Sequence, residues 1–318
     1  MTASELLRLP SDCLGEIFKY IVDLPDLYEL AGALPPRYRG EVQRVFRFAH
    51  PISKTKQWLQ HCIQGENESI MRFCLENSVD NALINTVNAR GLTALMLACE
   101  ENKLHIVELL LPHAGLDINL ASVVDGRGSP KSALSIAVEQ GCHAVVEKLL
   151  QRPEIDVNAG TPLVESLLYE QLNIYQLLLR DPRTDINGVD EFGDTALVWV
   201  AQLGDTQLIE QLLAFPLIDP NRGVPLIQAA MRGELNTIRL LLAHERTDIN
   251  CRDMCGSTAL LEAARYGHLD VVTELLSTSH IDIGVVNAHG ETELGVAPPE
   301  IRQQLEMLLQ ERARSQSR

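Results

Sequence analysis

A tripeptide of the form Asp-Ile-Asn returns along this chain of 318 residues. Its copies end, in chain order, at Asn85, Asn119, Asn158, Asn187, Asn221, Asn250 and Gly284. The successive intervals between these positions are 34, 39, 29, 34, 29 and 34 residues. A motif that returns about every 33 residues indicates stacked structural repeats, in which each repeat contacts only its neighbours. We therefore expect one extended stack of repeats instead of several independent domains.

The clearest repeat runs from residue 253 to residue 276. Asp253 and Gly256 suit a tight turn, and Thr258 is a good N-cap for a first helix that has a face of alanines. Gly267 is expected to end that helix, and the apolar residues of 269–276 have the spacing of a second one. Neither helix can bury its apolar side alone, so the repeat needs neighbours.

These residues resemble the ankyrin repeat, with its turn, its first helix ending in Ala-Ala-x-x-Gly-His and its Val-x-x-Leu-Leu second helix. The resemblance covers about residues 53–310. The first helices begin, in chain order, at Thr93-Ala94-Leu95, Ser132-Ala133-Leu134, Thr161-Pro162-Leu163, Thr195-Ala196-Leu197, Pro225-Leu226 and Thr258-Ala259-Leu260. The resemblance implies an all-α fold, an ankyrin-repeat solenoid of about seven to eight helix pairs.

The unequal intervals predict irregular repeats. The two 29-residue intervals leave little room before the helices that start near Gly160 and Gly223, so their projecting turns, or fingers, should be short or absent. The 39-residue interval holds the insertion Asp125–Lys131, a loop by composition. We expect a degenerate first repeat at 51–88, repeats at 89–285, a capping repeat at 286–312 and a tail at 313–318. The last helix would bury Ile301, Leu305, Leu308 and Leu309.

The segment 1–50 stands outside the repeat period. Ser11 is a good N-cap for a helix with one apolar face, and two further short helices are expected before residue 50. The pattern Leu-Pro-x-Asp-x-Leu-x-x-Ile-Phe resembles an F-box, a small three-helix module. That resemblance implies binding to the Skp-type adaptor of a cullin ubiquitin ligase through Leu9, Pro10, Leu14, Ile17 and Phe18. The alternative is an amphipathic cap that only covers the first repeat.

Composition narrows the partner class. The formal net charge is −16, which disfavours binding to nucleic acid or to anionic membrane surfaces. No apolar run reaches the length of a membrane span, and the N-terminus lacks the pattern of a signal peptide. The seven scattered cysteines are typical of reduced thiols, not of a disulfide framework. We expect a monomeric protein of the cytoplasm or nucleus.

The chain offers no motif for catalysis, and we expect no enzyme activity, no cofactor and no metal site. Cys251 and Cys255 lie in a finger turn without a second ligand pair at zinc spacing. Cys142 and His143 are adjacent on a helix, so their side chains should point about 100° apart. No phosphate-binding glycine loop follows a predicted strand.

The ankyrin resemblance implies that a target protein binds the finger tips and the exposed ends of the first helices. The best candidates, as aromatic, arginine or finger residues, are Arg90, Leu92, Tyr169, Phe192, Arg232, Arg265 and Tyr266. With the F-box-like start, this predicts a substrate-recognition subunit of a Skp–cullin–F-box ubiquitin ligase. The alternative is a non-catalytic ankyrin scaffold whose N-terminal helices only cap the solenoid.

Overall fold

The structure is a computed structural model that describes residues 84–122 and 130–316. The F-box-like segment, nearly all of the degenerate first repeat and most of the insertion lie outside these residues. The chain divides into a first part, Met1–Pro162, and a second part, Leu163–Arg318, each of which is described by itself.

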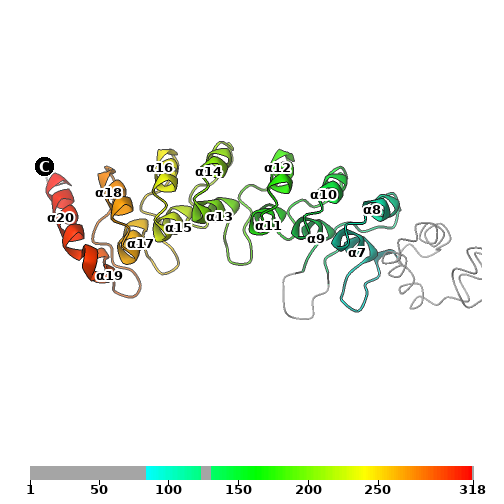
Figure 1. Cartoon of the computed structure of the whole chain (residues 1–318), viewed down its shortest axis with the longest axis horizontal. Coiled ribbons are helices and arrows are strands. Elements are labelled where there is room, and N and C mark those ends of the chain that lie inside the picture. The colour runs from blue at the N-terminus through cyan, green and yellow to red at the C-terminus, as the bar shows by residue number, and fades with distance from the viewer. Residues whose placement is uncertain (1–83, 123–129, 317–318) are drawn as a thin grey trace, which may run out of the picture. The chain divides into compact units, whose positions relative to one another are not determined.

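The described residues form pairs of antiparallel helices (Figure 1). The first part holds α7 (Ala94–Glu100), α8 (Leu104–Leu110), α9 (Ala133–Glu139) and α10 (His143–Leu150). The second part holds α11 (Pro162–Leu168), α12 (Leu172–Arg180), α13 (Ala196–Leu203), α14 (Thr206–Leu213), α15 (Pro225–Arg232), α16 (Leu235–Ala243), α17 (Ala259–Tyr266), α18 (Leu269–Ser277), α19 (Glu293–Val296) and α20 (Pro299–Gln316). Within 84–122 and 130–316 there is no β-strand, only an isolated bridge between Val189 and Thr195. The all-α prediction is confirmed for this portion of the chain.

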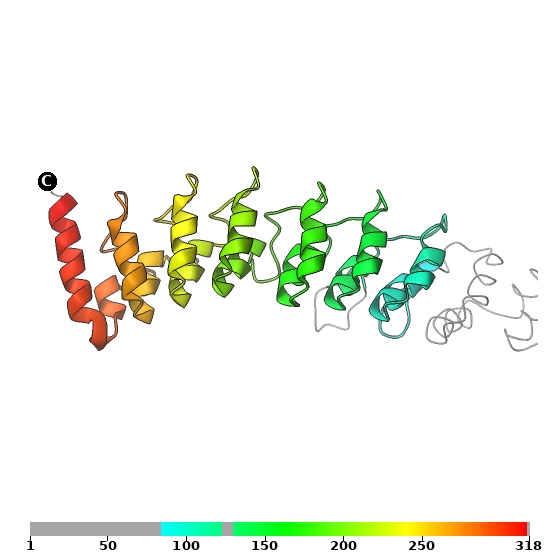
Figure 2. The same cartoon turned by 45° about the horizontal axis from the view of Figure 1, so that its top comes forward.

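Within each part the odd-numbered helices form one row, which we call inner, and the even-numbered helices form a second row, which we call outer. In the first part α7 packs on α9 and α8 on α10. In the second part α13, α15, α17 and α19 pack in succession, as do α14, α16, α18 and α20 (Figure 2). Five of the inner helices contain a fully buried alanine, whose small side chain allows neighbouring helices to approach closely: Ala98, Ala137, Ala201, Ala230 and Ala264. The core of the described residues thus consists mainly of small and branched aliphatic residues, with Tyr175 as a fully buried aromatic residue.

The predicted ends of the inner helices are confirmed. The Oγ1 of Thr258 accepts a hydrogen bond from the N–H of Leu261 at 3.3 Å, and the Oγ1 of Thr195 accepts one from Val198 at 3.3 Å. Gly267 ends α17 in the left-handed conformation, with φ of +80°, which glycine adopts without strain.

The recurring Asp-Ile-Asn tripeptide forms a ladder of hydrogen bonds between repeats. Its Asp accepts the N–H of its own Asn at 2.9–3.1 Å, and Ile118 and Ile186 are buried. The Asn Oδ1 then accepts the N–H of the next Asp at 2.7–2.9 Å, while its Nδ2 donates to a carbonyl two residues before that Asp at 2.7–2.8 Å. Both bonds are present at Asn85, Asn119, Asn187, Asn221 and Asn250. In these five copies the Asn therefore joins one repeat to the next.

Four fingers share one pattern of hydrogen bonds. In each, the first residue is Asp or Asn, whose Oδ1 accepts the N–H groups of the third and fifth residues. The fourth residue is a glycine, with φ between +74° and +86°. The four fingers are Asn88–Leu92, Asp190–Asp194, Asp253–Ser257 and Asn287–Glu291. The conserved bonding makes each finger a rigid projection before its inner helix.

Two inner helices begin without such a finger. Between Asn158 and α11 the chain makes a tight turn through Gly160 and Thr161, with φ of +83° and +57°. The same turn occurs before α15, where Gly223 has φ of +74° and Val224 has φ of +55°. In both places the preceding N-cap hydroxyl donates to a carbonyl of the turn: Ser132 Oγ to Ala159 O at 3.1 Å, and Thr195 Oγ1 to Arg222 O at 3.5 Å.

The C-terminal end of the stack is longer than the predicted capping repeat. Helix α20 continues through Gln316, so residues 313–316 are helical and not part of a tail as we expected. The side chain of Arg312 donates to the carbonyl of Thr278, which fixes this last part of α20 to the end of α18. Leu305 is fully buried, while Ile301, Leu308 and Leu309 are half-buried.

Candidate functional site

The fingers fold over the exposed side of the inner helices, so the two form one continuous surface. In the first part Arg90 of a finger bonds Glu100 at the end of α7 at 2.5–2.9 Å. In the second part Asp190 of a finger accepts from the indole Nε1 of Trp199 on α13 at 2.9 Å. We call the finger residues together with the exposed side of the inner helices the inner surface.

In the first part, ion pairs occupy the inner surface. Besides Arg90 and Glu100, Lys131 pairs with Glu139 at 2.6 Å. Arg90 was predicted as a partner-binding residue, and its guanidinium is engaged within its own repeat, where the hydrogen bond with Glu100 raises its pKa. Leu92 was predicted to be an exposed finger residue, but it is buried, with 8% exposure. The side chain of Leu92 is therefore not exposed as we expected.

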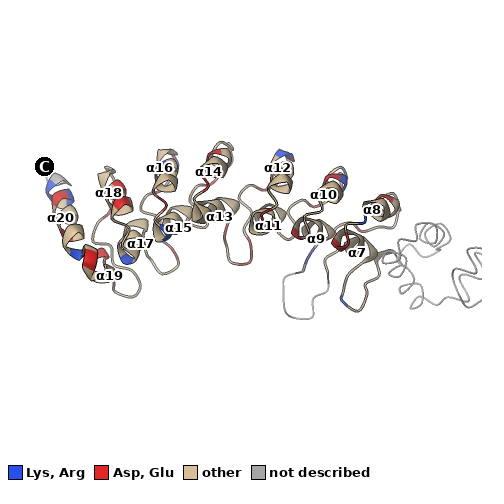
Figure 3. Ribbon diagram, viewed as in Figure 1, with Lys and Arg blue, Asp and Glu red and all other residues tan. Residues whose placement is uncertain are grey.

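In the second part the inner surface is rich in exposed apolar side chains. Phe192 at a finger tip is 76% exposed, Leu203 at the end of α13 is 63% exposed and Tyr266 at the end of α17 is 52% exposed. Leu168 at the end of α11 is 48% exposed, and Met254 at the next finger tip is fully exposed. Figure 3 shows helix α13 without charged residues, in contrast to the outer helices α12 and α18. Exposed large apolar residues that gather on one surface mark interaction sites.

The ends of three inner helices lie in register along this surface. A Cβ added at Gly204 would collide with the carboxylate of Glu234, and one added at Gly233 would collide with the ring of His268. Glu234 therefore covers Gly204, and His268 covers Gly233. Each covering residue directly follows the glycine that ends the inner helix of the next repeat. Leu203, Arg232 and Tyr266 directly precede these glycines and therefore form a row, in which an exposed arginine stands between two apolar side chains.

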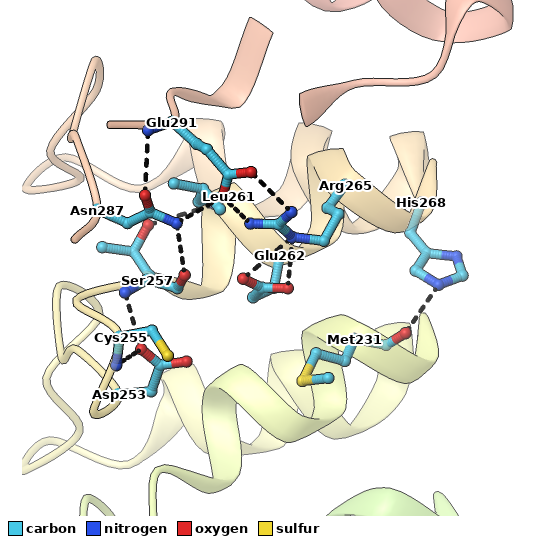
Figure 4. Close-up of polar contacts among 11 residues, drawn as sticks. Met231, Asp253, Cys255, Ser257, Leu261, Glu262, Arg265, His268, Asn287 and Glu291 are labelled. Carbon is cyan, nitrogen blue, oxygen red and sulfur yellow. Dashed lines mark hydrogen bonds and ion pairs between the residues drawn. The ribbon is translucent and has the colours of Figure 1, made fainter. Parts of the chain in front are cut away.

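Within that row Tyr266 has a defined orientation. Its ring stacks on the ring of His268, with centroids 6.5 Å apart and an angle of 19° between the planes. The Nε2 of His268 lies 3.2 Å from the carbonyl oxygen of Met231, as Figure 4 shows. The histidine thus connects the end of α17 to the end of α15.

Arg265, another predicted binding residue, belongs to a polar network between two repeats (Figure 4). Its guanidinium pairs with Glu262 at 3.1 Å and with Glu291 of the last finger at 2.7 Å. The Nδ2 of Asn287 also donates to Glu291 at 2.8 Å and to Ser257 Oγ at 3.3 Å. The hydrogen bond from Arg265, with that from Asn287, lowers the pKa of Glu291 to about 2. Arg265 therefore joins repeats, and its charge is already compensated.

Trp199 is the residue of this surface that sequence reasoning did not select. It lies on α13 between Leu197 and Ala201 and is half-buried under its finger. The available signal was a tryptophan within Thr195–Ala201, in a chain that has only two tryptophans. The neighbouring Asp194 has a raised pKa because of its burial and because Asp190 lies close by.

The remaining predicted residues fall in three groups. Tyr169, just after α11, is half-buried, whereas Phe192 and Arg232 are exposed. Leu9, Pro10, Leu14, Ile17 and Phe18 lie outside the described residues.

Three cysteines among the described residues have thiols with raised pKa values. Burial raises the pKa of the Cys99 and Cys142 thiols, and burial with nearby Asp248 and Asp253 raises that of Cys251 to about 11, which disfavours the nucleophilic thiolate. Within 84–122 and 130–316 no cluster of three or more His, Cys, Asp or Glu side chains has the geometry to hold a metal ion. Nor is any helix in the described portion long and apolar enough to span a membrane.

Comparison with known families agrees with this geometry. The family profile for ankyrin repeats, in three copies, matches residues 45–122, 163–253, 197–287 and 226–308. These segments cover more than half of the sequence, so the chain belongs to the ankyrin repeat family.

Curated relatives share the repeats over part of their length. The chain is 30% identical over 193 residues to ankyrin repeat and KH domain-containing protein mask-1 of Caenorhabditis elegans, covering 58% of this chain and 7% of that protein. It is 28% identical over 199 residues to ankyrin repeat domain-containing protein SAT10 of Stachybotrys chartarum, covering 61% of this chain and 10% of that protein. A probable E3 ubiquitin-protein ligase, XBOS33 of Oryza sativa subsp. japonica, is 48% identical over 52 residues, 16% of this chain and 10% of that protein. The chain thus spans only a small fraction of each of these relatives.

Proposed function

We propose that this chain is a non-catalytic adaptor that holds a target protein on the inner surface of its second part. The observation that carries the proposal is the set of exposed apolar side chains on this surface: Phe192 and Met254 in the fingers, and Leu203 and Tyr266 at the ends of inner helices. Aromatic residues, Met and Arg are enriched at protein interfaces, whereas isolated exposed apolar residues elsewhere carry no such meaning. The first part contributes less, because ion pairs already occupy its inner surface.

The test is capture of targets from native cells by the full chain, followed by mass spectrometry. We expect a double variant, Leu203→Ser with Tyr266→Ser, to lose the proteins that the wild type retains. Leu217→Ser is the matched control, because Leu217 is 81% exposed but lies in the loop after α14, away from the inner surface. Equal loss with the control, or full retention by the double variant, would refute the proposed surface.

We further propose that residues 1–50 attach this target-binding surface to a ubiquitin ligase. The support is the F-box-like pattern that contains Leu9, Pro10, Leu14, Ile17 and Phe18, together with the name of the relative from Oryza sativa, a probable E3 ubiquitin-protein ligase. The adaptor would act by proximity, raising the effective concentration of target lysines near a ubiquitin-charged enzyme. It would work as a monomer in the cytoplasm or nucleus.

Co-purification with a Skp-type adaptor tests this second proposal. Wild type should retain the adaptor, and Ile17→Asp with Phe18→Asp should release it, while target capture by the second part continues. If wild type does not bind the adaptor, the scaffold alternative holds, in which the N-terminal helices only cap the repeats. That alternative predicts loss of stability, and not of a partner, when residues 1–50 are removed.

A further inference from the structure

The row of fingers in the second part is interrupted. Fingers Asp190–Asp194 and Asp253–Ser257 belong to the repeats of α13 and α17, and the repeat of α15 between them has only the turn at Arg222 and Gly223. A Cβ added at Gly223 would lie 2.8 Å from Val198 Cγ2 and 3.1 Å from Gly193 O. The short turn therefore covers the base of the preceding finger and leaves its tip uncovered.

Where two fingers follow each other without interruption, their backbones are joined. The N–H of Ala288, the second residue of finger Asn287–Glu291, donates to the carbonyl of Cys255, the third residue of finger Asp253–Ser257, at 2.8 Å. In this pair, the N–H of a finger's second residue faces the preceding finger, and the carbonyl of a finger's third residue faces the following finger.

At the missing finger, both of these groups lack a partner among the described residues. The carbonyl of Phe192, the third residue of its finger, accepts no hydrogen bond from residues 84–122 or 130–316. On the other side, the N–H of Met254, the second residue of its finger, donates to none of them. Neighbouring inner helices pack about 8–10 Å apart, so these two fingers are separated by roughly 20 Å. The space between them, which we call the finger slot, has the width of one finger.

The segments that border the finger slot carry the carboxylates of Asp190, Glu191, Asp194 and Asp253 and the guanidinium groups of Arg222 and Arg252. The carboxylates of Asp190 and Asp253 are bound to the backbone of their own fingers, at 2.8–3.0 Å. Arg222 in the short turn and Arg252 just before the next finger are both exposed, and neither forms an ion pair or side-chain hydrogen bond with another described residue. Guanidinium groups without a partner among the described residues favour a partner segment that carries carboxylates at this place.

We propose that the finger slot is the docking site for an acidic turn of the target protein, which takes the place of the missing finger. Its backbone would donate to Phe192 O and accept from Met254 N–H, an addition to an unpaired backbone edge. Its carboxylates would pair with Arg222 and Arg252, and its apolar atoms would cover the rings and methyls at Phe192 and Met254. This inference rests on the proposed target-binding function and specifies the chemistry of the target.

The decisive variant fills the slot with the chain's own structure. Replacing Arg222–Val224 by a copy of Cys251–Thr258 adds a complete finger and lengthens the 29-residue interval to the 34 residues of its neighbours. The probe is a phage-displayed library of disulfide-constrained random heptapeptide loops, selected on the full wild-type chain. Enriched loops should contain Asp or Glu and bind the filled variant about tenfold more weakly or worse. Arg222→Glu with Arg252→Glu should weaken binding as much, and the control Arg180→Glu, exposed on outer helix α12, should not.

The outcomes separate the two proposals. Enriched loops that lack acidic residues, or that bind the filled variant as well as the wild type, overturn the finger slot. The proposed target surface survives that result if Leu203→Ser with Tyr266→Ser still abolishes loop binding. Failure to enrich any loop overturns both. If circular dichroism shows that the filled variant is unfolded, the arginine reversals decide, since unchanged binding there contradicts the docking site.

Discussion

The Asn ladder between repeats gives the sharpest stability prediction. In Asn221→Ala, two hydrogen bonds to the next repeat are lost: from Nδ2 to the carbonyl of Arg246 at 2.8 Å, and from the N–H of Asp248 to Oδ1 at 2.7 Å. Each such bond contributes about 1 kcal/mol net, which would total about 2 kcal/mol. Asn221 is half-buried, so water can reach part of the freed groups. We therefore expect a loss of about 1–2 kcal/mol in the free energy of unfolding.

Urea unfolding measured by tryptophan fluorescence checks this value. The chain has two tryptophans, and a Trp58→Phe background leaves Trp199, which reports on the second part where the change is made. Asn236→Ala is the matched control, because Asn236 is exposed on α16 and makes no side-chain hydrogen bond with a described residue. Alanine there should be neutral or slightly stabilising, since it is the better helix former.

An Asn221→Asp variant separates the two bonds. The carboxylate can still accept the N–H of Asp248 but cannot donate to the carbonyl of Arg246, which it would repel. We expect it to be at least as destabilised as Asn221→Ala. If Asn221→Ala shifts the urea midpoint no more than Asn236→Ala does, the hydrogen bonds of the ladder do not stabilise the stack as we propose.

Three further outcomes are expected. Gly193→Ala should lower the free energy of unfolding by about 1 kcal/mol because of its positive φ alone, since no heavy atom lies within 4 Å of an added Cβ. Gly223→Ala should lower it more, because its Cβ would also collide with neighbouring atoms. Equal urea midpoints for the two variants would contradict this. Thr258→Ala should cost about 1 kcal/mol by loss of its N-cap bond, measured in the same way. Glu291 has a pKa of about 2 in the folded chain against its ordinary 4.5, so its contribution to stability is present above pH 4.5 and is lost as the pH falls toward 2. Glu291→Gln should remove that part of the pH dependence, and a wild-type slope in the variant would refute the pairing with Arg265.

Local sequence signals predicted the repeat well. Thr258 and Gly267 mark the two ends of α17 because an N-cap hydroxyl and a left-handed glycine act on backbone groups within a few residues. The prediction of exposed residues was weaker. Leu92 is the last residue of its finger, and yet it is buried, with 8% exposure. Arg265 was selected for its type, and its charge is compensated by Glu291 of the following repeat, which no pattern within one repeat reveals.

The same contrast applies to the binding surface. The positions of the fingers and inner helices follow from the motif, so the candidate surface could be placed from sequence. Trp199 was missed because its contact with Asp190 forms only when the finger folds over α13.

The sequence by itself determined the architecture of this protein, because an Asp-Ile-Asn tripeptide at nearly constant intervals, with helix caps between, leaves few ways to bury the apolar faces. It also revealed where the intervals shorten. Only the tertiary structure decided what that shortening means. Stacking joins the last two fingers by a backbone bond, and it leaves Phe192 O and Met254 N–H without a finger between them. Whether a backbone group at a finger tip forms a hydrogen bond depends on the finger of the neighbouring repeat. The order of residues within one repeat does not specify that neighbour.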